Sequence, residues 1–279
     1  MADYWRKQQP GQPLYGDILW SRPERRDQAG RLTIIGGNSH GFSAVASAYQ
    51  LAKQLGVGEV RAVIPDALGA KLPTAVRRQL DDLILAPSNP SGGLALGAER
   101  DLAVAAGWSN NLLFIGDNGA NAETAKLLER FLTNPAHQET RVTLARDTID
   151  LLVYSAEALL ARENCHLVLS LAQLQKLARA VYYPRVITFS QGVKQIAETL
   201  HKFTISYRVA ITLFHDDNLF VAGEGEVVSQ PFTQPMRVWS GEIATREAAW
   251  SVWQPDIIKA TATGWTELYR EEGKCRDKR

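Results

Sequence analysis

From residue 31 onward the sequence alternates between short apolar runs and longer segments with helical spacing, and this alternation limits the possible folds more than any other feature. The first unit consists of the apolar run RLTIIG at 31–36, an Ala/Leu-spaced segment at 43–55 and a second apolar run, EVRAVIP, at 59–65. Strand, helix and strand in this order predict a right-handed crossover between neighbouring parallel strands. The first third of the chain therefore predicts the start of a parallel sheet.

The same unit recurs toward the C-terminus. Further strands are predicted at 111–116, 140–145 and 166–170, each followed by a helix, at 122–132, 149–161 and 171–181. The period then changes, because RVAITLF and LFVAG flank the polar turn HDDN at 215–218 and predict an antiparallel hairpin, with a helix at 242–254 after it. Repeated units of this length predict an α/β sandwich with helices on both faces of a mainly parallel sheet.

The remaining segments suggest a single domain with an arm. Residues 1–30 lack periodicity and are expected to pack on the domain as an N-terminal arm, while 31–279 form one α/β domain. Loops are predicted at 86–97 and 223–235, and the charged tail REEGKCRDKR is expected to be a solvated end. The turn HDDN could suggest a metal site, but its place between two apolar strands favours a solvated hairpin.

Composition excludes several classes of function. Lysine plus arginine at 31 and aspartate plus glutamate at 30 give a net charge of +1, so no overall field favours nucleic acid or an acidic membrane. Cys165 and Cys275 are far apart and outside any CxxC pattern, which indicates neither a disulfide framework nor a zinc site. No segment approaches the ~20 apolar residues of a membrane span, and the N-terminus has no apolar signal core. A cytoplasmic protein is expected.

The loop after the first strand is the most informative motif. Gly37, Asn38, Ser39, His40 and Gly41 match G-x-S-x-G, the nucleophile elbow of α/β-hydrolases. That fold needs several strands before its elbow, and here only about thirty residues precede Ser39. Asp147 with His201 or His215 could complete a triad, but histidines scattered over the chain make this choice weakly constrained. A serine hydrolase acting through Ser39 is the least favoured alternative.

The glycine spacing also fails to match two phosphate-binding loops. A P-loop needs Lys and Ser/Thr after its second glycine, whereas Gly41 is followed by Phe42 and Ser43, and the spacing departs from GxGxxG. Closely spaced glycines between a strand and a helix N-terminus still leave backbone amides for an anion or a polar ligand. The alternative is a tight turn that binds nothing.

In its order of motifs the chain resembles the ADP- or ATP-dependent NAD(P)H-hydrate dehydratases, the YjeF C-terminal family of the ribokinase-like superfold. GRLTIIGGNSHGFSAVASAYQLAKQLGVGEVRAVIPDAL resembles the family's start, and NLLFIGDNGANAETAKLLERFL its IGPGLG segment. TLARDTIDLL lies where the family has DADALN, CHLVLSLAQLQKLARAV where it has LTPHPGE, and VWSGEIATREAAWSVWQ where it has G-x-G-D. The resemblance runs from Gly30 to about Gln254.

This resemblance implies a ribokinase-like three-layer αβα sandwich and a set of site residues. Glu242 would be the catalytic base in place of the family's aspartate. Nucleotide and phosphate would contact Ser240, Gly241, Gly116 and Asn118, and the substrate would contact Gly37, Asn38, Ser39, His40, Gly41, Ser43 and Asp147. No metal-ligating side chain is predicted, and Mg²⁺ would accompany ADP or ATP.

Several positions depart from the family pattern. Trp239 replaces the first glycine of G-x-G-D, and an indole there would reshape a phosphate pocket. The family's HPGE is replaced by Ala172, Gln173, Leu174 and Gln175, and Asp150 stands in place of an asparagine. A carboxylate at the start of a helix is also favoured by the helix dipole, so Glu242 and Asp147 have purely structural explanations. These departures indicate altered or lost chemistry.

The sequence thus predicts a divergent NAD(P)H-hydrate dehydratase, a lyase in which ADP or ATP phosphorylates a hydrated nicotinamide cofactor and phosphate elimination regenerates NADH or NADPH. A degenerate homologue that binds a nucleotide, or acts by association, is the main alternative, and a small-molecule kinase is another. The resemblance also implies a homo-oligomer. Trp250 and Trp253, at helical spacing, are expected in the core or at a subunit interface.

Overall fold

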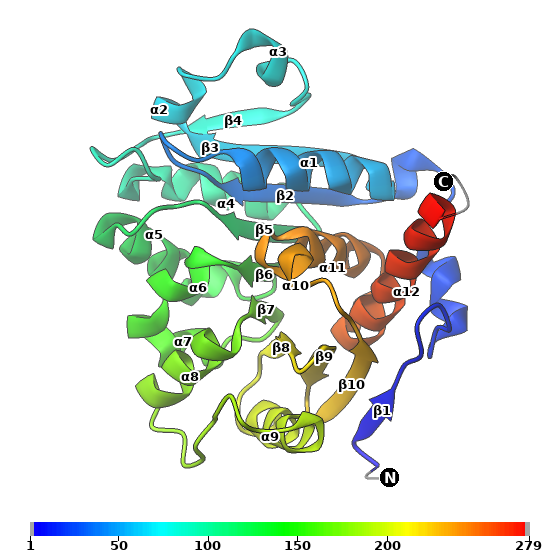
Figure 1. Cartoon of the computed structure of the whole chain (residues 1–279). Coiled ribbons are helices and arrows are strands. Elements are labelled where there is room, and N and C mark those ends of the chain that lie inside the picture. The colour runs from blue at the N-terminus through cyan, green and yellow to red at the C-terminus, as the bar shows by residue number, and fades with distance from the viewer. Residues whose placement is uncertain (1–2, 277–279) are drawn as a thin grey trace.

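In the computed structural model of the chain, helices cover both faces of one large sheet (Figure 1). The structure describes the backbone of residues 3–276 and, within that range, all side chains except those of residues 75 and 269–276. The side chains of the charged tail, 270–279, and thus its predicted solvation, lie outside this description. The described strands pair in the order β1-β10-β9-β8-β7-β6-β5-β2-β3-β4.

Strands β2 to β8 pair with one another in parallel, and antiparallel pairing begins between β8 and β9. The strands are β1 (Trp5–Lys7), β2 (Arg31–Gly36), β3 (Glu59–Pro65), β4 (Leu83–Ala86), β5 (Asn111–Gly116), β6 (Arg141–Ala145), β7 (Cys165–Leu169), β8 (Ala210–His215), β9 (Asn218–Gly223) and β10 (Glu226–Pro231). β9 and β10 continue the sheet as an antiparallel hairpin, and β1 is added at its edge parallel to β10.

The α-helices fill the connections between the strands. They are α1 (Ser43–Leu55), α2 (Asp66–Gly69), α3 (Thr74–Arg77), α4 (Glu99–Trp108), α5 (Ala122–Thr133), α6 (Asp147–Leu151), α7 (Ala156–Leu160), α8 (Leu171–Ala180), α9 (Val193–Ser206), α10 (Pro235–Trp239), α11 (Glu242–Trp253) and α12 (Ile257–Arg276). The N-terminal arm also contains the 3₁₀ turns η1 (Gly16–Ser21) and η2 (Arg26–Gln28).

Alternate residues of each strand point into two separate cores. Ile34 and Leu113 pack with α1, α11 and α12, whereas Ile35 and Leu112 pack with α4, α5 and α8 on the opposite face. The apolar runs are continuous because both faces of the central strands are covered, as is usual for parallel sheets. The mainly parallel αβα sandwich with a C-terminal antiparallel hairpin is therefore confirmed.

The strand order reverses at one point. From β2 the chain moves outward through β3 to β4 and then returns to β5, which pairs with the other side of β2. The loops after β2 and β5 consequently leave the sheet toward opposite faces. Open α/β sheets bind ligands in the crevice at such a reversal, beyond the carboxyl ends of the strands.

Several element predictions differ from the structure. The helix predicted at 149–161 is interrupted by a 3₁₀ turn, Val153–Ser155, which changes the helical phase so that both Ile149 and Leu159 are buried. The loop predicted at 223–235 contains β10, and the arm supplies β1. Helices α4, α9 and α12 and strand β4 are among the elements that were not predicted. In β10 the polar Ser229 and Gln230 are buried because Trp5 and Gln8 in the arm bond to them, a compensation that no local pattern reveals.

Candidate functional site

The reversal between β2 and β5 brings the glycine loop close to the loop after β5. Gly37 donates its backbone N–H to Gly116 O at 2.9 Å, and a Cβ at Gly36 would lie 2.3 Å from the same oxygen. Gly36 and Gly116 both have positive φ, 155° and 93°. Glycine is needed at Gly36 because the two backbones meet there without room for a side chain.

Asn38 organises the glycine loop from within. Its backbone pairs with that of Gly41 in both directions, at 2.9 and 3.1 Å, and its Oδ1 accepts a bond from His40 N at 2.7 Å. Its Nδ2 donates to Asp117 O at 2.6 Å, which ties the loop to β5. The turn is thus fixed largely by its own hydrogen bonds.

Asp117 occupies the position where an anion was expected. Its Oδ2 accepts the backbone N–H of Ala44 at 3.1 Å, in the first turn of α1. A carboxylate is favoured there because the N-terminal amides of a helix carry a partial positive charge. The chain's own carboxylate therefore binds at the helix N-terminus that the glycine pattern suggested for a ligand.

Asp147 holds the loop after β5. Its Oδ1 accepts Asp117 N at 2.8 Å, and its Oδ2 accepts the N–H groups of Asn118 at 2.8 Å and Gly119 at 3.2 Å. Asn118 is buried and its Nδ2 donates to Thr148 Oγ1 at 2.9 Å. Asp147 is therefore already engaged with three backbone amides, and Gly116 has no room for a Cβ, which would lie 2.2 Å from Asp147 Oδ1.

Arg146 connects these loops to the WSGE segment. One of its terminal nitrogens forms an ion pair with Asp117 Oδ1 at 2.8 Å, and its Cδ lies 3.4 Å from where a Cβ on Gly241 would be. Arg146 and Asp117 both have positive φ, 57° and 59°, a conformation that non-glycine residues rarely adopt. Such strain is often found at functional sites, where the surrounding contacts enforce it.

The WSGE segment forms the turn between α10 and α11. Ser240 N donates to Met236 O at 2.8 Å and Gly241 N to Val238 O at 3.1 Å, while Ser240 Oγ donates to Arg237 O at 3.2 Å. The two amides expected to contact phosphate thus close the last turn of α10. Gly241 has a φ of 89° and directly precedes the first residue of α11, Glu242.

Glu242 is held by arginines of α10 and α11. Arg237 donates Nε to Glu242 Oε1 at 2.8 Å and makes a second, closer contact to the same oxygen through Nη2. Arg246, one helical turn on, places Nη2 3.8 Å from Oε1. The glutamate side chain is 29 % exposed. The carboxylate is thus oriented at the helix N-terminus and accessible to solvent.

The Pro87–Leu96 connection covers part of the glycine loop. Ser39 N donates to Gly92 O at 2.9 Å, and a Cβ on Gly92 would lie 2.1 Å from Ser39 Oγ. His40 and Ser43 remain exposed. Among the described side chains Ser39 has no histidine partner, because His201 bonds to Gly225 O and His215 to Gln191 O. The two histidines nominated for a triad therefore bond elsewhere.

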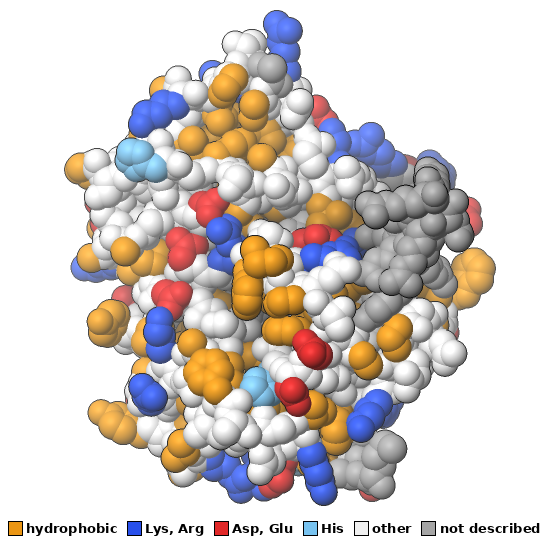
Figure 2. Space-filling view, in the orientation of Figure 1, with side chains coloured by type: hydrophobic (Ala, Val, Ile, Leu, Met, Phe, Trp, Pro, Cys, Tyr) orange, Lys and Arg blue, Asp and Glu red, His pale blue; other side chains and the backbone are white. Residues whose placement is uncertain are grey.

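A cavity of about 360 Å³ adjoins Arg146 and Asp147. Trp239 and Val238 form its apolar side, while Lys176 and Ser170 lie on its polar side. Trp239 is 54 % exposed, and Figure 2 shows hydrophobic side chains grouped near the middle of this face of the molecule, with acidic and basic side chains beside them. The position that the family gives to glycine thus presents an indole beside a cavity at the strand ends.

Sequence reasoning missed Asp117, Arg146 and Arg237, and it assigned no role to Gln173. Gln173 Nε2 donates to both Arg146 O and Asp150 Oδ2, each at 2.8 Å. Gln173 and Asp150 are both positions where the sequence departs from the family pattern, and they contact each other. The available sequence signal was that two positions more than twenty residues apart both depart from the family pattern. A single sequence does not show that two such positions contact each other.

The described residues contain no group of three or more His, Cys, Asp or Glu side chains arranged to hold a metal ion. Within that same part of the chain, none of the helices has both the length and the apolar composition needed to cross a membrane.

Comparison with solved structures places the fold. A ribokinase-like superfamily protein from Enterococcus faecalis matches with a TM-score of 0.71 at 15 % identity, over all of this chain and 90 % of that one. YxkO of Bacillus subtilis, a member of the UPF0031 family, matches with a TM-score of 0.61 at 12 % identity, over 93 % and 91 % of the two chains.

A third solved structure carries an enzymatic description. The ADP/ATP-dependent NAD(P)H-hydrate dehydratase of Bacillus subtilis, co-crystallised with ATP and Mg²⁺ and soaked with CoA, has a TM-score of 0.61 at 13 % identity, over 93 % of this chain and 90 % of that one. No protein-family model matches the chain, and no curated protein sequence is significantly similar to it. The matches to solved structures show that the chain has the ribokinase-like fold.

Proposed function

We propose that this protein is a divergent ADP- or ATP-dependent NAD(P)H-hydrate dehydratase with Glu242 as its catalytic base. The contacts of Glu242 carry the proposal: those made by the described residues all go to Oε1, from Arg237 and Arg246. Oε2 has no hydrogen-bond partner among the described residues, so it can take a proton while Oε1 is held in place. A catalytic base needs this combination of a fixed position and an accessible lone pair.

In the proposed reaction the substrate hydroxyl gives its proton to Glu242 and attacks the terminal phosphoryl group of the nucleotide. The nucleotide leaves shortened by one phosphate. The carbon–oxygen bond of the phosphorylated ring then breaks to release phosphate, the neighbouring ring carbon loses a proton, and the double bond that forms regenerates NADH or NADPH. Phosphoryl transfer depends mainly on positioning and on groups that stabilise the developing negative charge. Arg237 and Arg146 flank the Ser240–Gly241 turn and would supply this stabilisation in our proposal.

The amides of Ser240 and Gly241 are engaged in α10 and would contact phosphate only if that turn opened. Gly116 and Asn118 would line the phosphate side. Exposed atoms of the loop from Gly37 to Ser43 would hold substrate hydroxyls, and Asp147 would act by holding Asn118 in place. Mg²⁺, which would neutralise nucleotide phosphates, would be bound mainly by those phosphates, since the described side chains form no metal-ligand cluster.

The test measures the return of NADH absorbance from chemically prepared NADH hydrate, with ADP or ATP and Mg²⁺. Native protein should restore it, and Glu242→Gln should lower the rate by about 10²-fold or more, because general acid–base groups contribute about that much. Glu129→Gln, on the exposed face of α5, is the matched control and should keep full activity. Equal rates for the native protein and Glu242→Gln would remove Glu242 as the base.

A second function is favoured by a different observation. The amides of the α10–α11 turn and the N-terminus of α1 are both satisfied by the chain itself, which suits a homologue that binds a nucleotide without turnover. Nucleotide binding measured by calorimetry, combined with no recovery of NADH from folded protein, would identify this alternative. Phosphorylation of a small alcohol without dehydration would instead indicate a kinase.

A further inference from the structure

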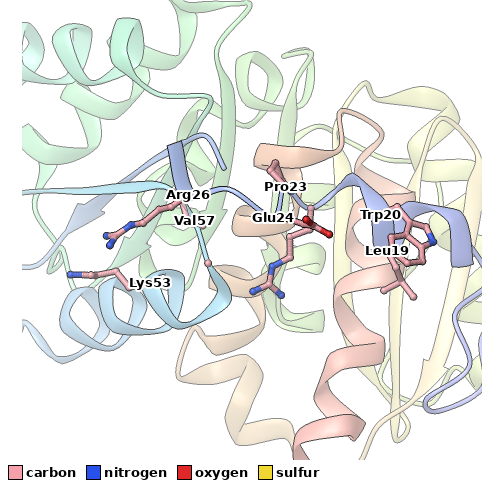
Figure 3. A pocket seen from close by; sticks show the side chains of 9 residues that line it. Leu19, Trp20, Pro23, Glu24, Arg26, Lys53 and Val57 are labelled. Atoms are coloured by element: carbon pink, nitrogen blue, oxygen red, sulfur yellow. The ribbon is translucent and has the colours of Figure 1, made fainter. Parts of the chain in front are cut away.

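A second cavity lies at the opposite end of α1 from the glycine loop. It has a volume of about 660 Å³, within the ~300–1,000 Å³ typical of small-molecule sites. The N-terminal arm and the last turn of α1 form it (Figure 3). Helix α1 has 13 residues and so separates this cavity from the glycine loop by about 20 Å. We propose that it binds a nucleotide, with the phosphate at one end and the base at the other.

The phosphate end is formed by Arg26 and Lys53, which Figure 3 shows side by side at one end of the cavity. Arg26 donates its Nε to Gly58 O at 3.1 Å, and the other nitrogens of its guanidinium have no partner among the described residues. Lys53 pairs with Asp81, whose side chain is 62 % exposed. A solvent-exposed ion pair of this kind is weak, so a phosphate can compete for the lysine.

The base end is formed by Trp20, the last large side chain of η1. Its side chain is 85 % exposed, although an indole normally gains by packing against another surface. Figure 3 shows Trp20 next to Leu19, at the end of the cavity away from Arg26 and Lys53. An exposed indole beside a cavity is a stacking platform for a planar ring, and every nucleobase has the required face.

Glu24 lies between the two ends (Figure 3). An exposed carboxylate disfavours an anion in its immediate neighbourhood, but it accepts hydrogen bonds from hydroxyl groups. The order along the cavity is therefore cations, carboxylate and indole, which matches phosphate, ribose and base. Arg22 is a wall of the cavity rather than a phosphate ligand, because it is paired with Glu267 at 3.2 Å and lies over the ring of Trp253.

Isothermal titration calorimetry, which measures the affinities for AMP and for adenosine, tests the proposal. AMP should bind about tenfold or more tightly than adenosine, and Lys53→Met should remove this preference. Trp20→Ala should weaken both ligands, and Trp20→Phe, which keeps a flat ring, should largely restore binding. Because Trp20 is exposed and the Lys53 side chain is 29 % exposed, these variants are expected to fold. Equal affinity for AMP and adenosine, or affinities unchanged in Trp20→Ala, would overturn the proposal.

One further variant distinguishes the arm cavity from the nucleotide site proposed beside Glu242. Trp239→Ala, at the cavity beside Glu242, should leave AMP binding to the arm unchanged. If Trp239→Ala abolishes all nucleotide binding, the arm has no site of its own and the proposal fails. If AMP binding responds to Trp20 while NADH hydrate is never repaired, the proposed dehydratase fails and the arm site stands.

Discussion

At the residue scale, the most unusual group outside the candidate site is the buried carboxyl of Glu247. Its Oε1 accepts Trp265 Nε1 at 2.9 Å, and its Oε2 lies 3.5 Å from His166 Nε2, which also contacts Thr212 Oγ1 at 2.9 Å. Burial raises the pKa of Glu247 to about 8 and lowers the pKa of His166 to about 3. Both side chains are therefore uncharged in the folded protein near neutral pH, with the proton on the glutamate.

This pair predicts how stability depends on pH. Between pH 6.5 and 8 the unfolded pair binds no proton and the folded pair binds one, so stability is lost as pH rises, by about 2 kcal/mol. Between 4.5 and 6.5 each state binds one proton and the pair contributes no slope. Below 4.5 the unfolded pair binds two, so stability falls again as pH falls toward 3.

Glu247→Gln should remove the loss between pH 6.5 and 8. It should also make stability fall from pH 6.5 downward instead of from 4.5, because only His166 then titrates and the unfolded state alone binds its proton below 6.5. Urea unfolding at a series of pH values measures the loss of stability on both the acid and the alkaline side. Glu129→Gln, an exposed carboxyl, should follow the native curve. A Glu247→Gln curve that still falls between pH 6.5 and 8 would show that another group causes the loss.

The sequence predicted most of the loops of the candidate site but few of its contacts. The glycine loop, Asp147 and Glu242 carry local signals, namely glycine spacing and acids at helix starts. Asp117 and Arg146 carry none, because their importance comes from an ion pair between two strand ends about thirty residues apart. Contacts of this kind depend on strand order, which residue spacing alone does not give.

At the element scale, the start of α11 depends on one left-handed residue. Gly241 has a φ of 89°, and a Cβ there would lie 2.6 Å from Ile115 Cδ1. Gly241→Ala should destabilise the protein by about 1–3 kcal/mol, because it adds backbone strain and a steric clash at the same position. Glu242 follows directly, so the orientation of its carboxylate should change as well.

Gly107→Ala is the matched control for this substitution. Gly107 lies within α4, and a Cβ there would meet no atom within 4 Å. Alanine should therefore stabilise the helix by about 0.5–1 kcal/mol. Thermal unfolding of both variants should show shifts of opposite sign, and a shift of the same sign in both would contradict this reading of Gly241.

Sequence patterns predicted the longer central strands from their apolar runs but missed the short apolar β4 and the two strands with a weak apolar signal, β1 and β10. β2, β3 and β5 are largely apolar runs whose bounds were predicted as observed. β1 has only three residues, and β10 contains buried polar side chains, so neither shows strand periodicity. Elements that depend on distant partners are the least visible in a local pattern.

At the scale of the whole molecule, the arm fastens the sheet edge to α12 through one side chain. Gln8 is fully buried, and its Nε2 donates to Gln230 Oε1 and to Ala262 O, each at 2.6 Å. Its Oε1 accepts Leu14 N at 3.1 Å. The side-chain amide of Gln8 thus forms hydrogen bonds with β10, with α12 and with the arm itself.

Gln8→Leu should lower the free energy of unfolding by about 2–4 kcal/mol, because it leaves buried polar groups without partners. The neighbouring Gln9→Leu is exposed and should change it little. Urea unfolding followed by tryptophan fluorescence and circular dichroism should give one shifted transition. Two separate transitions would instead show that the arm unfolds independently of the sheet.

The position of β1 has a consequence during synthesis on the ribosome. Trp5 pairs with Val227 in the sheet, and Gln8 bonds to Ala262. The arm is translated first, yet its partners emerge only after more than two hundred further residues have been added. Trp5 and Gln8 therefore lack their native partners while the parallel strands assemble. The pairing of β1 with β10 therefore forms late in synthesis, and a chaperone that binds exposed indoles would find Trp5 available until then.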